Sequence, residues 1–165
     1  MKLWVVVSSC LVIATGCVGE DEEEGGGLVA DSVCSSGLRW TGGNEESPLM
    51  HPGMDCVSCH AGGEGPDFLA AGTVYGQLDE PDDCAGIAGV TVQITDANGK
   101  TVTSTTNAAG NFYFDARTAL AFPVMAKVQL EGREKMMSIA QSTGACASCH
   151  VAVPSETLPG RIVAP

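Results

Sequence analysis

Two short segments with the pattern Cys-x-x-Cys-His constrain this chain more than any other feature of its sequence. They are Cys56-Val57-Ser58-Cys59-His60 and Cys146-Ala147-Ser148-Cys149-His150. Two intervening residues allow one helical turn to present both thiols to the vinyl groups of a haem, and the next residue offers an imidazole to the iron. The pattern therefore predicts two covalently attached haem c groups, with His60 and His150 as proximal iron ligands.

The same four cysteines allow two other arrangements. Their thiolates could together form a zinc site, or they could pair with one another as disulfides. Neither alternative explains why a histidine follows both cysteine pairs, and zinc-binding thiolates are at risk of oxidation outside the cytoplasm. Haem attachment is therefore the favoured interpretation.

The amino terminus has the composition of an export signal. Lys2 precedes an apolar stretch, residues 3–13, which is too short to span a membrane as a helix. The following Ala14-Thr15-Gly16-Cys17 is similar to the lipobox of bacterial lipoproteins. We expect a signal peptide over residues 1–16 and lipidation of Cys17, with ordinary signal-peptidase cleavage nearby as the alternative. Either way the mature protein would work in the periplasm, at the outer membrane or at the cell surface.

Acidic residues dominate the segment after Cys17. Residues 20–24 are all acidic and residues 25–27 are all glycine, so residues 17–33 are predicted to form a flexible tether. The formal net charge of the chain is −12, and loss of Lys2 with the signal would make it about −13. Nucleic acid is therefore excluded as a partner, whereas a redox partner with a basic surface would be attracted.

Of the eight cysteines, Cys10 leaves with the signal, Cys17 is the expected lipid site, and four belong to the haem motifs. Cys34 and Cys84 remain, and in an oxidising compartment their expected state is a disulfide. Residues 34–70 would then form the first haem-binding segment, built from loops with one short helix at the motif.

The segment between the motifs has the pattern of an antiparallel β-sandwich, which we expect over residues 71–132, followed by a second haem-binding segment over residues 133–165. Apolar and polar residues alternate along residues 90–95 and again along residues 124–130, as they do in strands with one buried face. A turn over residues 96–100 predicts a hairpin, and both phenylalanines of residues 112–114 should face the core. The expected fold class is mainly β, with short helices at the motifs.

Residues 89–100 and 105–114 resemble the carboxypeptidase regulatory-like, or transthyretin-like, family of sandwich domains. The flanks Met50-His51-Pro52-Gly53 and Pro159-Gly160-Arg161-Ile162 resemble a group of exported myxobacterial proteins that combine this sandwich with two haem motifs. The first resemblance implies a scaffold or adhesion module without catalytic residues. The second implies haem binding and a location in the outer envelope.

Each iron of an electron carrier needs a second axial ligand, usually His or Met. The candidates are Met50, His51 and Met54 ahead of the first motif, and Met136 and Met137 ahead of the second. A crossed arrangement, in which each segment supplies the haem of the other motif, is one possibility. The methionines could instead be apolar filling, and His51 could be a surface imidazole.

These features together predict an exported, lipid-anchored dihaem c-type cytochrome that transfers electrons between redox partners of the envelope. The chain shows no cluster of catalytic acids and bases, so an electron carrier is favoured over an enzyme. Two alternatives stay open, namely a haem enzyme or sensor with one open iron site, and a surface lipoprotein that binds carbohydrate or protein and contains structural haem.

Overall fold

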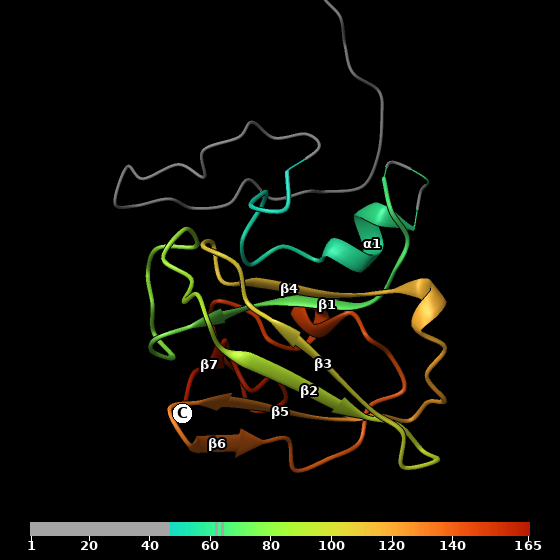
Figure 1. Cartoon of the computed structure of the whole chain (residues 1–165). Helices are drawn as coiled ribbons and strands as arrows, with labels where there is room; N and C mark the ends of the chain where they lie inside the picture. Colours follow the sequence, from blue (N-terminus) through green and yellow to red (C-terminus); the bar gives the residue numbers. More distant parts are fainter. Residues whose placement is uncertain (1–46, 62, 64) are drawn as a thin grey trace, which may run out of the picture.

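The computed structural model describes residues 47–61, 63 and 65–165, and in them the chain is mainly β (Figure 1). The strands are β1 Phe68–Tyr75, β2 Thr91–Thr95, β3 Thr101–Thr105, β4 Asn111–Asp115, β5 Met125–Leu130, β6 Arg133–Met136 and β7 Ile162–Val163. The helical segments are the α-helix α1 Cys56–His60 and the 3-10 turns η1 Ala116–Thr118 and η2 Cys146–Ser148.

The strands form two sheets, in the orders β4-β1-β7 and β3-β2-β5-β6, with the hydrophobic core between them. All pairs are antiparallel except β1 with β7, which run parallel. The prediction of a mainly β fold with two sheets is confirmed. The parallel pair departs from the purely antiparallel sandwich, because β7 reaches β1 only after the chain has passed through the second motif.

Alternating burial along the strands confirms the predicted core faces. In β2, Val92 and Ile94 are buried while Thr91, Gln93 and Thr95 are less buried. In β4, Phe112 and Phe114 are buried and their rings meet edge to face, whereas Tyr113 between them is exposed. The β2–β3 hairpin turns at Asp96, whose carboxylate accepts hydrogen bonds from the backbone N–H groups of Asn98 and Lys100 at 2.8 Å.

The sheets extend beyond residues 71–132 at both ends. β1 begins at Phe68, while β6 and β7 lie after residue 132. Every residue of β6 is exposed and β7 has only two residues, so neither strand carries the alternation from which strands are recognised in a sequence. Met136, expected on a segment leaving the sandwich, is in fact the last residue of β6.

The segment before α1 lies against the outer face of the β4-β1-β7 sheet. The N–H of Gly53 donates to Thr73 Oγ1 at 2.8 Å, and Asn111 Nδ2 donates to the carbonyl of Met50 at 2.9 Å. Thr73 Oγ1 in turn donates to Asn111 Oδ1 at 2.7 Å. These polar contacts fix the segment before the first motif relative to β1 and β4, and Figure 1 shows α1 on the side of this sheet away from the other sheet.

Several predictions fall on residues outside the described part of the chain. They are the signal peptide, the lipidated Cys17, the acidic tether and Cys34. Cys84 is disulfide-bonded, and its pairing with Cys34 stays a prediction. Among the described residues, no helix is long and apolar enough to cross a membrane.

Candidate functional site

The first motif forms the single helical turn α1. Asp55 caps its start by accepting a hydrogen bond from the N–H of Ser58 at 3.2 Å, and the N–H of Ala61 closes its end on the carbonyl of Val57 at 2.9 Å. The thiols of Cys56 and Cys59 are free. The expected short helix at this motif is therefore present, with both cysteines on one turn.

The second motif also forms one turn. The N–H groups of Cys149 and His150 both donate to the carbonyl of Cys146, at 3.2 and 2.9 Å, and both thiols are free. Directly before the turn, Ala145 forms a parallel bridge with Ala71 of β1, and the carbonyl of Gly144 accepts a hydrogen bond from the N–H of Ala71 at 3.1 Å. The second motif is thus attached to the edge of β1.

Both motifs meet at β1, although they are far apart in the sequence. α1 and η2 each contact this strand, and a Cβ at Gly72 would lie 3.0 Å from the Cβ of Cys146. The pKa of the Cys146 thiol is raised to about 12, first by burial and next by the negative charge of ionised Cys56. That charge effect requires Cys56 and Cys146 to be near each other. Strand β1, which contacts both motifs, keeps them close.

Burial also raises the pKa of the Cys56 thiol, to about 11. At neutral pH both Cys56 and Cys146 are therefore protonated, neutral thiols rather than thiolates.

The imidazole of His150 is held by the carboxyl-terminal segment. Its Nδ1 lies 2.8 Å from the carbonyl oxygen of Gly160, which can only accept, so Nδ1 carries the proton. Nε2 is then the nitrogen with a free lone pair. A ring nitrogen hydrogen-bonded to a carbonyl while the other is free to bind metal is the usual state of a metal-binding histidine.

Arg161 fixes the position of Gly160. Its side chain is buried, pairs with the carboxylate of Asp83, donates from Nε to the carbonyl of Glu80 at 2.9 Å, and lies 4.1 Å from the centre of the Tyr75 ring. Neither Gly160 nor Arg161 was identified as a site residue by its chemistry in the sequence analysis, where both entered only through the resemblance of the flanks. Their roles depend on contacts with residues far away in the sequence.

The imidazole of His60 has different neighbours. Its ring lies 4.3 Å from the ring of Phe68, which stacks at 4.8 Å on Tyr113 of β4. The Nδ1 atom of His60 is buried and has no hydrogen-bond partner. Gly65 lies so close that a Cβ there would be 2.9 Å from this atom. The two motif histidines are therefore held in unlike surroundings.

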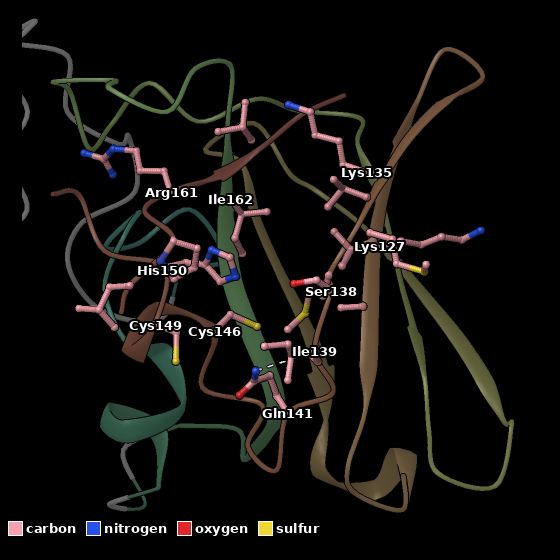
Figure 2. A pocket seen from close by; sticks show the side chains of 18 of the residues that line it. Lys127, Lys135, Ser138, Ile139, Gln141, Cys146, Cys149, His150, Arg161 and Ile162 are labelled. Atoms are coloured by element: carbon pink, nitrogen blue, oxygen red, sulfur yellow. Dashed lines mark hydrogen bonds between the residues drawn. The ribbon is translucent and has the colours of Figure 1, made fainter. Parts of the chain in front are cut away.

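A pocket of about 850 Å³ opens beside the second motif (Figure 2). It lies between the two sheets, and its lining is mostly apolar. Its volume is within the range of roughly 300–1,000 Å³ found for small-molecule and cofactor sites. The lining includes core residues of both sheets, the second motif, and the segment after β5: Ala70, Val92, Ile94, Phe112, Cys146, Cys149, His150, Met136 and Met137.

The pocket brings together some of the candidate axial ligands and not others. Met136 and Met137 line it with His150, the proximal candidate of their own motif. Met50, His51 and Met54 belong to the segment before α1 and do not line it. This grouping differs from the crossed arrangement, in which Met136 and Met137 would serve the first motif.

No family model, curated protein or solved structure matches this chain. The resemblances to the sandwich family and to exported dihaem proteins therefore stay predictions, and only the residues of this chain support a cofactor.

The donor set at the second motif fits a c-type haem. Cys146 and Cys149 would hold the porphyrin through thioether bonds, His150 would bind the iron through Nε2, and the pocket would receive the apolar macrocycle. Among the described residues, no three or more His, Cys, Asp or Glu side chains lie together as a metal-binding group.

Proposed function

We propose that this chain is an exported dihaem c-type cytochrome that transfers electrons between redox partners of the bacterial envelope. The observation that carries the proposal is that two Cys-x-x-Cys-His turns, each with free thiols, meet at the same strand β1. Both the repeated motif and its convergence in space are expected of a chain that holds two haems near each other.

The roles of the motif residues follow from their chemistry. Cys56 and Cys59 would anchor one haem and Cys146 and Cys149 the other, with His60 and His150 as proximal ligands. Haem iron supplies a one-electron redox couple when it is bound. The sandwich acts as a rigid scaffold, and its strand β1 sets the separation of the two sites.

The charge and the amino terminus support the cellular setting. A formal charge of about −13 on the mature chain would steer it toward a basic surface on its redox partner. The lipobox-like sequence at Cys17 and the acidic segment after it support an anchored protein whose folded part stands away from the membrane.

The test is a pyridine haemochrome assay and absorption spectra on the full chain, made in a host that attaches c-type haem. We expect two haems per chain in the wild type. The Cys56→Ala/Cys59→Ala and Cys146→Ala/Cys149→Ala variants should each retain one haem, and each serves as the control for the other.

Three results would distinguish the possible interpretations. Absence of covalent haem from the wild type would refute the proposal. Two haems of which one shifts its spectrum on addition of carbon monoxide or cyanide would favour an enzyme or sensor with an open iron. Two low-spin haems whose spectra change with neither carbon monoxide nor cyanide would support the electron carrier.

A further inference from the structure

The two faces of β6 differ in what they contact. In the antiparallel β5–β6 pair, Lys135 is opposite Val128, and Met136 is opposite Lys127. Directly opposed residues point to the same face of a sheet. Val128 is buried in the core between the sheets, so Lys135 points toward the inner face. Met136 shares the outer face with Lys127, whose side chain forms an ion pair with Glu134.

Met137 continues this alternation onto the inner face. Its N–H donates to the carbonyl of Ala126 at 2.9 Å, and Ala126 packs against the core. Met137 is half-buried, whereas Met136 is 66% exposed. Of the two adjacent methionines, Met137 is therefore the one whose thioether belongs to the inner face.

The pocket places this inner face opposite the second motif. Met137 and His150 both line it, and Figure 2 shows the His150 imidazole and the Cys146 thiol on one side, with Ser138 and Ile139 of the segment after β6 across from them. His150 Nδ1 is engaged by the carbonyl of Gly160, which leaves Nε2 for iron. A six-coordinate haem takes its two axial ligands from opposite faces, and a thioether is one of the two usual partners of imidazole.

From this geometry we propose that Met137 is the sixth ligand of the haem held by Cys146, Cys149 and His150. The proposal rests on the proposed function and deepens it, because it assigns the second haem to the pocket between the sheets and makes its ligand pair His–Met. Met50, His51 and Met54 then remain candidate ligands for the first motif.

Lys135 supports this placement independently. It alternates with Met137 on the inner face, lines the pocket, and donates from Nζ to the carbonyl of Ala164 at 3.0 Å. A cation at the rim of an apolar pocket, in a chain with only eight basic residues, suits the carboxylates of a porphyrin edge. Strand β6 would thus supply the charge that orients the macrocycle, and Met137, directly after it, the iron ligand.

The test compares Met137→Ala with Met136→Ala in the full-length, haem-loaded protein. Met136→Ala is the control for the choice between the two methionines, because Met136 also lines the pocket but lies on the outer face of the β5–β6 pair and is 66% exposed. We expect Met137→Ala to keep two covalent haems, to bind one more carbon monoxide per chain than the wild type, and to lose the upfield-shifted methyl proton resonance of an iron-bound methionine. The control should match the wild type in all three measurements.

The proposal is overturned if Met137→Ala binds no more carbon monoxide than the wild type, or if Met136→Ala produces the change instead. Should Met137→Ala fail to retain the second haem, Met137→His decides. A retained, ligand-insensitive second haem with a lowered reduction potential supports Met137, because replacing thioether by imidazole lowers the potential. An unchanged potential overturns it.

These outcomes are distinct from failure of the proposed function. A wild type without covalent haem would remove the proposed function and this inference together. If the wild type holds two haems and Met137→Ala has the same spectra, only the assignment of Met137 is removed.

Discussion

At the scale of single residues, the two motif histidines differ in what orients their rings. His150 donates from Nδ1 to the carbonyl of Gly160 at 2.8 Å, whereas His60 packs on Phe68 and its buried Nδ1 has no hydrogen-bond partner. A carbonyl acceptor fixes the tautomer of a ligand histidine and raises its basicity. The fold alone thus fixes the His150 ring with its Nε2 atom unengaged by Gly160.

The orientation of His150 depends on the buried ion pair between Arg161 and Asp83, since Arg161 follows Gly160 directly. We expect Arg161→Gln to lower the free energy of unfolding by about 3–5 kcal/mol, because it removes a buried guanidinium from its contacts with Asp83, Glu80 and Tyr75. The Arg161 side chain is only 3% exposed. Urea denaturation followed by circular dichroism measures the change.

Arg117→Gln is the control for this prediction. It breaks an ion pair with Asp115 in which the arginine side chain is 91% exposed, and such pairs contribute little to stability. We expect no measurable change in the urea midpoint. Equal effects of the two substitutions would show that the Arg161–Asp83 pair does not stabilise the fold.

Burial of the Cys146 thiol predicts a dependence of stability on pH in the haem-free chain. Its pKa is raised to about 12 in the fold, from an ordinary value of 9.0. The neutral thiol is therefore favoured by folding, so its contribution is fully present below pH 9 and is lost as the pH rises toward 12. The urea midpoint, measured anaerobically at pH 8 and pH 11, should fall less in Cys146→Ala than in the wild type.

Cys149→Ala is the matched control from the same turn. Its urea midpoint should fall between pH 8 and pH 11 by as much as that of the wild type. The other thiol with a raised pKa, Cys56, stays in both variants, so part of the pH dependence should persist even without Cys146. An identical fall in Cys146→Ala and the wild type would mean that Cys146 is not buried as its surroundings indicate.

At the scale of elements, the strands whose burial alternates were predictable and the others were not. β2 and β4 carry the alternation in their sequences, with Val92, Ile94, Phe112 and Phe114 on the core side. β6 is exposed along its whole length and β7 is only two residues long, so each is a strand only because a partner strand lies beside it. The helical turns at the motifs were predictable from haem chemistry, whereas the docking of His150 on Gly160 depends on the tertiary fold.

Docking of the second motif on β1 depends on the absence of a side chain at Gly144. A Cβ there would collide with the carbonyl oxygen of Leu69 and with Ala70. We expect Gly144→Ala to destabilise the fold by about 1–3 kcal/mol, the usual cost of overpacking. In the haem-loaded protein it should lower the amount of haem bound at the second motif, while the first motif keeps its haem. The haemochrome assay measures both.

Ser142→Ala provides the control, because Ser142 is exposed and lies just before the same turn. It should leave both the stability and two haems per chain unchanged. Full haem loading of Gly144→Ala, with wild-type stability, would contradict the close approach of Gly144 to β1.

At the scale of the whole molecule, the two motifs stand in different relations to the core. Cys146 packs against the core cluster, and the pocket beside it lies between the sheets. α1 has no buried residue and lies on the outer face of the β4-β1-β7 sheet. A haem at the second motif would therefore complete the interior of the sandwich, whereas a haem at the first motif would cover its outside.

This asymmetry predicts unequal contributions of the two haems to thermal stability. Burial of apolar surface stabilises a fold by roughly 25 cal/mol per Å², and the pocket between the sheets offers the second haem more apolar surroundings than α1 offers the first. We expect Cys146→Ala/Cys149→Ala to lower the Tm more than Cys56→Ala/Cys59→Ala does, with each variant confirmed to hold one haem. Circular dichroism during heating measures both, and the two double variants are matched in chemistry. Equal losses, or a larger loss on removal of the first haem, would mean that the second haem is not bound between the sheets.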